Sequence, residues 1–301
     1  MTQFKPADAS DWRQIAWNGV RFDTPADWEI GHIGYHHLLL ETTAGPVMEV
    51  KWGPVNGKFS FRSQFKQLAA SQGRRLRGSL REVRLPAPWG QVLAHYESLG
   101  FAWQSGPVNG RGVLLYCPGC RQATLLQFFE KTGRPPLTHA DRVLASFADH
   151  DRRPVTLWSV FDIRAHLPAA YHLKKFRFDA GCYTLDFANR RSRLSLRRWS
   201  PAAVLLADGG LEGFEKRSLG WSANREVRFK QRSPLAMELE EGPPGRFSSR
   251  CYRRLQRLPL YRSARLWHEV EKNRLLGVRL EDRKPVDAGM LERICETYVT
   301  V

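Results

Sequence analysis

Hydrophobic and polar residues alternate in many short runs along this chain, and longer segments with a helical period lie between those runs. Residues 47–52 predict a strand with one buried face, because Met48, Val50 and Trp52 alternate with Glu49 and Lys51. In residues 59–71, Phe61, Phe65 and Leu68 recur at intervals of three and four. This spacing predicts an amphipathic helix whose apolar stripe packs on a sheet.

Further strands are predicted for short, largely apolar runs that end near turn-forming residues, among them residues 90–99, 112–116 and 123–130. Helical patterns around Val143 and over residues 287–298 close the two halves of the chain. Short turns between strands favour antiparallel pairing. We therefore expect each half to be α+β, with an antiparallel sheet flanked by helices.

Two local patterns occur twice, which indicates an internal duplication. In the first pattern, a Phe-Asp pair is followed by a proline, and an aromatic residue comes three positions after the proline. Its two copies are Phe22, Asp23, Pro25 and Trp28, and then Phe161, Asp162, Pro168 and Tyr171. The second ends a strand at a tryptophan two residues before proline, in residues 51–54 and 198–201. The duplication predicts two similar domains, residues 1–150 and 151–301, with Trp52 and Trp199 at equivalent positions.

Each half resembles the PsbP-like or Mog-like α/β/α sandwich, in which an antiparallel sheet lies between helices after an extended opening segment. The residues that carry this resemblance are Phe22, Pro25, Trp28, Trp52, Gly53 and Pro54, and then Pro168, Tyr171, Trp199 and Pro201. The resemblance implies a non-catalytic adaptor or binding module. It implies no specific functional residue.

The chain is strongly basic, with 47 Lys and Arg against 30 Asp and Glu, and the second half carries most of the excess. Such a charge favours an anionic partner, either nucleic acid or an acidic protein, although a general arginine-rich composition is an equal explanation. The candidate anion-binding residues are Arg190, Arg191, Arg193, Arg197, Arg198, Arg253 and Arg254. Arginine forks suit phosphate and carboxylate groups, and nearby aromatic rings could stack on bases.

Cys117 and Cys120 form a C-x-x-C pair on a predicted turn between two strands. Two such thiols can provide half of a zinc site, form a redox disulfide, or be incidental to the turn. Under the duplication, a shift of 151 places the pair at His268 and Glu271, so the metal hypothesis combines these four residues. The five cysteines, an odd number, argue against a disulfide framework.

No motif of a known catalytic class is present, which favours a non-catalytic protein but does not exclude an enzyme whose residues converge from distant positions. We expect a cytoplasmic protein without a membrane segment, because residues 1–14 lack the pattern of an export signal and no apolar run approaches membrane-helix length. The leading expectation is a binding protein without a cofactor. A zinc- or thiol-dependent protein and a nucleic-acid-binding protein are the alternatives. The oligomeric state is left open.

Overall fold

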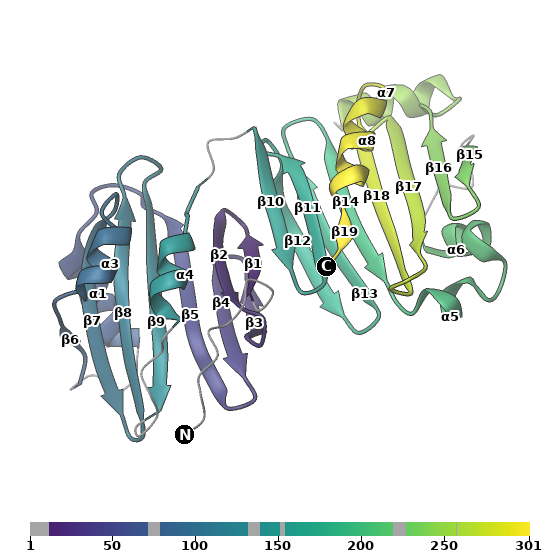
Figure 1. The fold of residues 1–301 in the computed structure, drawn as a ribbon. Coiled ribbons are helices and arrows are strands. Elements are labelled where there is room, and N and C mark those ends of the chain that lie inside the picture. Colours follow the sequence, from purple (N-terminus) through teal and green to yellow (C-terminus); the bar gives the residue numbers. More distant parts are fainter. Residues whose placement is uncertain (1–11, 72–78, 132–138, 151–153, 219–226, 257) are drawn as a thin grey trace. The chain divides into compact units, whose positions relative to one another are not determined.

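The computed structural model describes residues 12–71, 79–131, 139–150, 154–218, 227–256 and 258–301 (Figure 1). The chain divides into two compact units, residues 1–152 with 159–161, and residues 153–158 with 162–301. The described residues form an α+β protein built mainly from antiparallel strands. None of the helices in these ranges is long and apolar enough to cross a membrane.

The first unit contains a hairpin and a seven-stranded antiparallel sheet. The hairpin consists of β1 (Trp12–Trp17) and β2 (Val20–Pro25). The sheet has the order β3-β4-β5-β9-β8-β7-β6. Its strands are β3 (Glu29–Gly34), β4 (His37–Thr42), β5 (Gly45–Pro54), β6 (Arg81–Glu82), β7 (Glu97–Ser105), β8 (Val108–Cys117) and β9 (Gln122–Lys131). The helices are α1 (Phe61–Ser71), α3 (Ala87–Val92) and α4 (Ala140–Ser146).

The second unit contains a seven-stranded antiparallel sheet with the order β12-β13-β14-β18-β17-β16-β15. Its strands are β12 (His172–Asp179), β13 (Cys182–Ala188), β14 (Arg193–Trp199), β15 (Val227–Ser233), β16 (Ala236–Glu241), β17 (Tyr261–Glu269) and β18 (Arg274–Asp282). The remaining strands are β10 (Val155–Val160), of which residues 159–160 are assigned to the first unit, β11 (Ile163–Pro168) and β19 (Val299–Thr300). The helices are α5 (Ala202–Leu206), α6 (Gly210–Ser218), α7 (Phe247–Leu255) and α8 (Ala288–Thr297).

The two seven-stranded sheets share one strand order. If the strands of each sheet are numbered along the chain, both read 1-2-3-7-6-5-4. In each case the second residue after the last helix pairs with an earlier strand, Ala148 with Arg21 and Val299 with Arg164. The helices differ between the described parts of the two units. Helix α3 lies between the fourth and fifth strands of its sheet, whereas α7 lies between the fifth and sixth, and α5 and α6 follow the third strand of the second sheet where α1 follows that of the first.

The predicted helix over residues 59–71 is confirmed as α1, and its stripe packs as expected. Phe61, Phe65 and Leu68 lie against a cluster on one face of the first sheet, formed by Phe101, Trp103, Leu114 and Leu125. Residues 87–92, partly predicted as a strand, are helical instead. There the ring of Trp89 packs 5.6 Å from that of Phe128, and its Nε1 donates to Asp141 of α4 at 2.7 Å.

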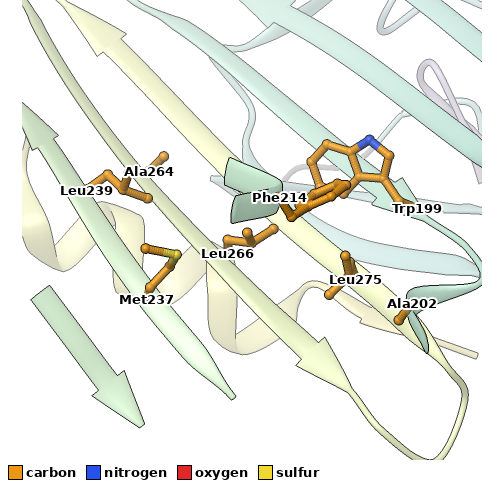
Figure 2. Packing of buried hydrophobic residues seen from close by; sticks show 8 residues of the cluster. All are labelled: Trp199, Ala202, Phe214, Met237, Leu239, Ala264, Leu266 and Leu275. Atoms are coloured by element: carbon orange, nitrogen blue, oxygen red, sulfur yellow. The ribbon is translucent and has the colours of Figure 1, made fainter. Parts of the chain in front are cut away.

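In the second unit, α5 and α6 pack against the core around Trp199. Figure 2 shows the side chains of this cluster. The ring of Phe214 from α6 meets the indole edge-to-face, with centroids 5.1 Å apart. The sheet beneath contributes Met237, Leu239, Ala264, Leu266 and Leu275. Burial of this set removes a large apolar area from water, and each Å² of that area stabilises the fold by about 25 cal/mol.

Strand register shows that Trp52 and Trp199 are not equivalent, which corrects the prediction from the sequence. In the first sheet, Val50 of β5 pairs with Leu38 of β4. The corresponding buried pair between the second and third strands of the second sheet is Leu196 with Leu185. Since neighbouring residues of a strand point to opposite faces, this register places Arg198 at the position of Trp52. Trp199 therefore lies on the other face of its sheet.

Candidate functional site

The two cysteines lie on the turn that joins β8 to β9, as the sequence predicts. Cys117 ends β8 and Gln122 begins β9. The turn is closed by the N–H of Arg121, which donates to the carbonyl of Cys117 at 2.8 Å, and Arg121 has a positive φ of 56°. A thioredoxin-type thiol needs a helix N-terminus to stabilise its thiolate, and here both flanking elements are strands.

Asp149 and His150 reach this turn from the segment after α4. Ala148 is held beside β2 by two backbone hydrogen bonds with Arg21, of 2.8 and 2.9 Å. The next two residues then meet the thiols. Cys120 Sγ donates to Asp149 Oδ2 at 3.3 Å, and Cys117 Sγ lies 3.8 Å from His150 Nδ1. The four side chains offer ligand atoms that all lie within 4.8 Å of one another.

The carboxylate of Asp149 is the buried centre of this group, because its side chain is only 1% exposed. It accepts hydrogen bonds from Tyr96 Oη at 3.1 Å and from His150 Nδ1 at 2.7 Å. Gln122 Nε2 donates to the main-chain oxygen of the same residue at 3.2 Å. Partial burial and the adjacent carboxylate raise the pKa of Cys120 to about 12, so the thiol is protonated when no cation is near.

The sequence prediction combined Cys117 and Cys120 with His268 and Glu271. Those two residues belong to the second unit, and their combination with the cysteines stays a prediction. Asp149 and His150, which supply the neighbouring groups, are not among the site residues predicted from the sequence. An Asp-His pair directly after the closing helix was the available clue, but nothing in its spacing connects it to a turn 29 residues earlier.

The corresponding turn of the second unit joins β17 to β18, between Glu269 and Arg274. In each turn, four residues lie between the last two residues that pair across the hairpin. Glu269 therefore occupies the position of Cys117, and Lys272 occupies that of Cys120. The shift is therefore one residue larger than the sequence suggested, and His268 and Glu271 are not the counterparts. Lys272 Nζ donates to the carbonyl of Thr300, and Glu269 accepts from the N–H of Thr300 at 3.4 Å and from its hydroxyl.

The seven arginines predicted to bind anions do not share one surface environment. Arg198 is buried and pairs with Asp162, so its charge is already neutralised. Two others donate to main-chain oxygens, Arg197 to Ser218 at 3.0 Å and Arg253 to Pro259 at 2.9 Å. The exposed members of the set are Arg190, Arg191, Arg193 and Arg254.

Helix α7, which we call the basic helix, was missed by the sequence analysis. No side chain of this fully described helix is buried. Phe247 is 79% exposed, Leu255 is 80% exposed and Tyr252 is 61% exposed. Phe247 and Leu255 are separated by two steps of four residues along the helix, so they lie on the same side of it. The region is strongly basic, since residues 242–268 contain seven arginines and no acidic residue.

Comparisons with known proteins give little guidance. No protein-family model matches the chain, and no curated protein matches its sequence. Among solved structures, one match is a protein from Bacteroides thetaiotaomicron VPI-5482, with a TM-score of 0.32 and 13% sequence identity. The match covers 50% of this chain and 53% of that one. At this level of similarity it supports no inference about function.

Proposed function

We propose that the protein is a non-catalytic binding protein that contacts an anionic partner through the basic helix. The observation that carries this proposal is the high exposure of Phe247 and Leu255 on a helix rich in arginine. Large apolar side chains on one exposed face commonly mark a contact surface. Arg250 and Arg254 are exposed beside them and would meet negative charge.

The cysteine turn is a weaker basis for an activity. Four protein side chains around one point leave no open coordination position, and an open position is what a catalytic metal requires. The turn is therefore better suited to a structural role. For this reason the functional proposal rests on the basic helix.

A test uses three polyanions with the full-length chain: a single-stranded oligonucleotide, polyglutamate, and vesicles that contain phosphatidylglycerol. Binding to at least one of them should weaken steeply with salt, because exposed charges are screened. Arg254→Glu should abolish most of that binding. Arg62→Glu, which reverses an exposed arginine on α1 of the first unit, is the matched control and should bind like the wild type. Absence of binding to all three at low salt would refute the proposal.

Single-stranded nucleic acid is the second candidate, favoured by the exposed rings of Phe247 and Tyr252 on the same helix as the arginines. Stacking of a base on an aromatic side chain contributes about 1–3 kcal/mol. Two or three phosphate contacts would give a slope of log K against log salt of roughly −1.4 to −2.1. A Phe247→Ser variant should bind oligonucleotide more weakly at every salt concentration while keeping this slope.

We also propose that the two units descend from a tandem duplication of one PsbP-like or Mog-like domain. The shared strand order and the equivalent pairings of Ala148 with Arg21 and of Val299 with Arg164 support this origin. The different places of α3 and α7 along the chain would be later changes. An experimental structure in which residues 12–150 and 154–301 have different strand orders would contradict the duplication.

A further inference from the structure

We propose that Cys117, Cys120, Asp149 and His150 bind one Zn²⁺ ion, which ties the β8–β9 turn to the segment after α4. The inference goes beyond the proposed binding function and does not depend on it. Its basis is the convergence of four different ligand side chains from two separate parts of the first unit, with ligand atoms no more than 4.8 Å apart.

The geometry is close to that of a tetrahedral site. Bonds of about 2.0–2.3 Å to zinc place the ligand atoms roughly 3.3–3.8 Å from one another. The separation of Cys120 Sγ from Asp149 Oδ2 is 3.3 Å, and that of Cys117 Sγ from His150 Nδ1 is 3.8 Å. Since no two ligand atoms are more than 4.8 Å apart, the separations exceed the ideal range by at most about 1 Å. Small side-chain rotations on a surface turn can close that difference.

The burial of Asp149 is an independent reason to expect a cation. A buried carboxylate is costly unless it is paired with positive charge or held by strong donors. Around Asp149 the described partners are a phenol, a thiol and the imidazole of His150, which compensates the carboxylate charge only when the ring is protonated. A thiol is a weak donor. A divalent cation would compensate the carboxylate charge, and Tyr96 and Gln122 would orient the residue from outside the ligand set.

The second unit shows that this connection matters to the fold. Its equivalent turn is joined to the segment after α8 by Lys272 and Glu269, both of which bond to Thr300. A charged amine and a carboxylate make these contacts directly. In the first unit the same two turn positions carry cysteines, whose thiols form only weak hydrogen bonds. A metal ion supplies there the connection that ionic side chains supply in the second unit.

The donor set selects zinc among common divalent ions. Two thiolates exclude magnesium and calcium, which prefer oxygen ligands, and an imidazole and a carboxylate complete a tetrahedral set of sulfur, nitrogen and oxygen donors. On binding, each cysteine thiol loses its proton to solvent, while the imidazole binds as the neutral ring and the carboxylate is already ionised. With four protein ligands the site is closed and structural.

The test measures metal in the full-length, reduced chain after growth with zinc. Wild-type protein should hold about one zinc per chain, and replacement by Co²⁺ should give the visible absorption and the near-ultraviolet thiolate band of a tetrahedral site. Cys120→Ser and His150→Gln should lower zinc affinity at least about tenfold. Cys251→Ser, which changes an exposed cysteine on the basic helix, is the matched control and should retain the metal.

Cys120 is exposed, so its serine variant is expected to fold, and far-ultraviolet circular dichroism checks this. Zinc should also protect two thiols of the wild type from a disulfide-exchange reagent, and a chelator should remove the protection. Folded wild-type protein that takes up neither zinc nor Co²⁺ would overturn the proposal. Unchanged zinc affinity in Cys120→Ser would overturn it equally. Should Cys120→Ser not fold, the Co²⁺ spectrum and thiol protection of the wild type decide the matter.

Discussion

Cys120 Sγ lies 3.3 Å from Asp149 Oδ2, although the two residues are 29 positions apart in the chain. The contact joins a hairpin turn to the segment that follows the last helix of the first unit. The same two places are joined in the second unit by Lys272 and Thr300. The two units thus connect the same turn to the same segment with different side chains, a thiol and a carboxylate in the first unit and an amine and a main-chain carbonyl in the second.

The first prediction concerns Asp149. Asp149→Asn keeps the shape of the side chain but removes the charged acceptor for Tyr96 and Cys120. We expect the free energy of unfolding to fall by about 1–3 kcal/mol, the usual cost of an impaired buried hydrogen bond. Urea denaturation measures this, and the loss should be larger with zinc than with a chelator. Asp27→Asn, at an exposed position, should change stability little. Equal losses in the two variants would contradict the prediction.

The second prediction concerns Arg198, whose guanidinium pairs with Asp162 at the tip of the β10–β11 hairpin. Asp162→Ala leaves a buried charge without its partner and should cost about 3 kcal/mol. Arg198→Met combined with Asp162→Ala should be less destabilising than Asp162→Ala alone, because the buried charge is then absent. Thermal unfolding of both variants shows which is the more stable. A double variant that is less stable than Asp162→Ala would refute the explanation by an unpaired buried charge.

The third prediction concerns pH. Burial raises the pKa of Glu238, but hydrogen bonds from Arg232 and Arg265 outweigh it and hold the pKa below the usual 4.5. A carboxylate with a lowered pKa stabilises the fold above its unfolded-state pKa, and this contribution is lost as the pH falls through the folded-state pKa. Wild-type stability should therefore decline below about pH 4.5, and Glu238→Gln should show a smaller decline. If the free energies of unfolding of the two proteins fell in parallel from pH 6 to the pH at which the fold is lost, this prediction would be contradicted.

The fourth prediction concerns the basic helix. Because Phe247 and Leu255 are exposed, Phe247→Ser and Leu255→Ser should leave the free energy of unfolding within about 0.5 kcal/mol of the wild type. Leu266→Ala, in the core of the second sheet, should instead cost about 2–5 kcal/mol. Chemical denaturation distinguishes them. A large loss in the Phe247 variant would show that this ring packs within the fold and is unavailable to a partner.

The sequence predicts most of the strands and the helices α1, α4 and α8, because their apolar residues follow a clear period. It misses α7, since the apolar residues of that helix face away from the core and form no buried stripe. It also equates Trp52 with Trp199. Side chains alternate between faces, so an offset of one residue in β14 moves the tryptophan to the opposite face of the sheet.

The candidate site is only half visible in the sequence for a related reason. Cys117 and Cys120 are recognisable because their spacing is local. Asp149 and His150 become their neighbours only through the backbone pairing of Ala148 with Arg21, which is a long-range feature of the fold. No local pattern encodes it. Thiols are weak hydrogen-bond donors, and a bound cation would explain why two of them occupy the β8–β9 turn.

X-ray absorption at the zinc edge of the loaded full-length chain tests the metal centre most directly. We expect two sulfur neighbours at about 2.3 Å and two nitrogen or oxygen neighbours at about 2.0–2.2 Å. In Cys120→Ser one sulfur should be lost from the spectrum. A first shell without sulfur in the wild type, or with two sulfurs still present in Cys120→Ser, would contradict the proposed zinc centre.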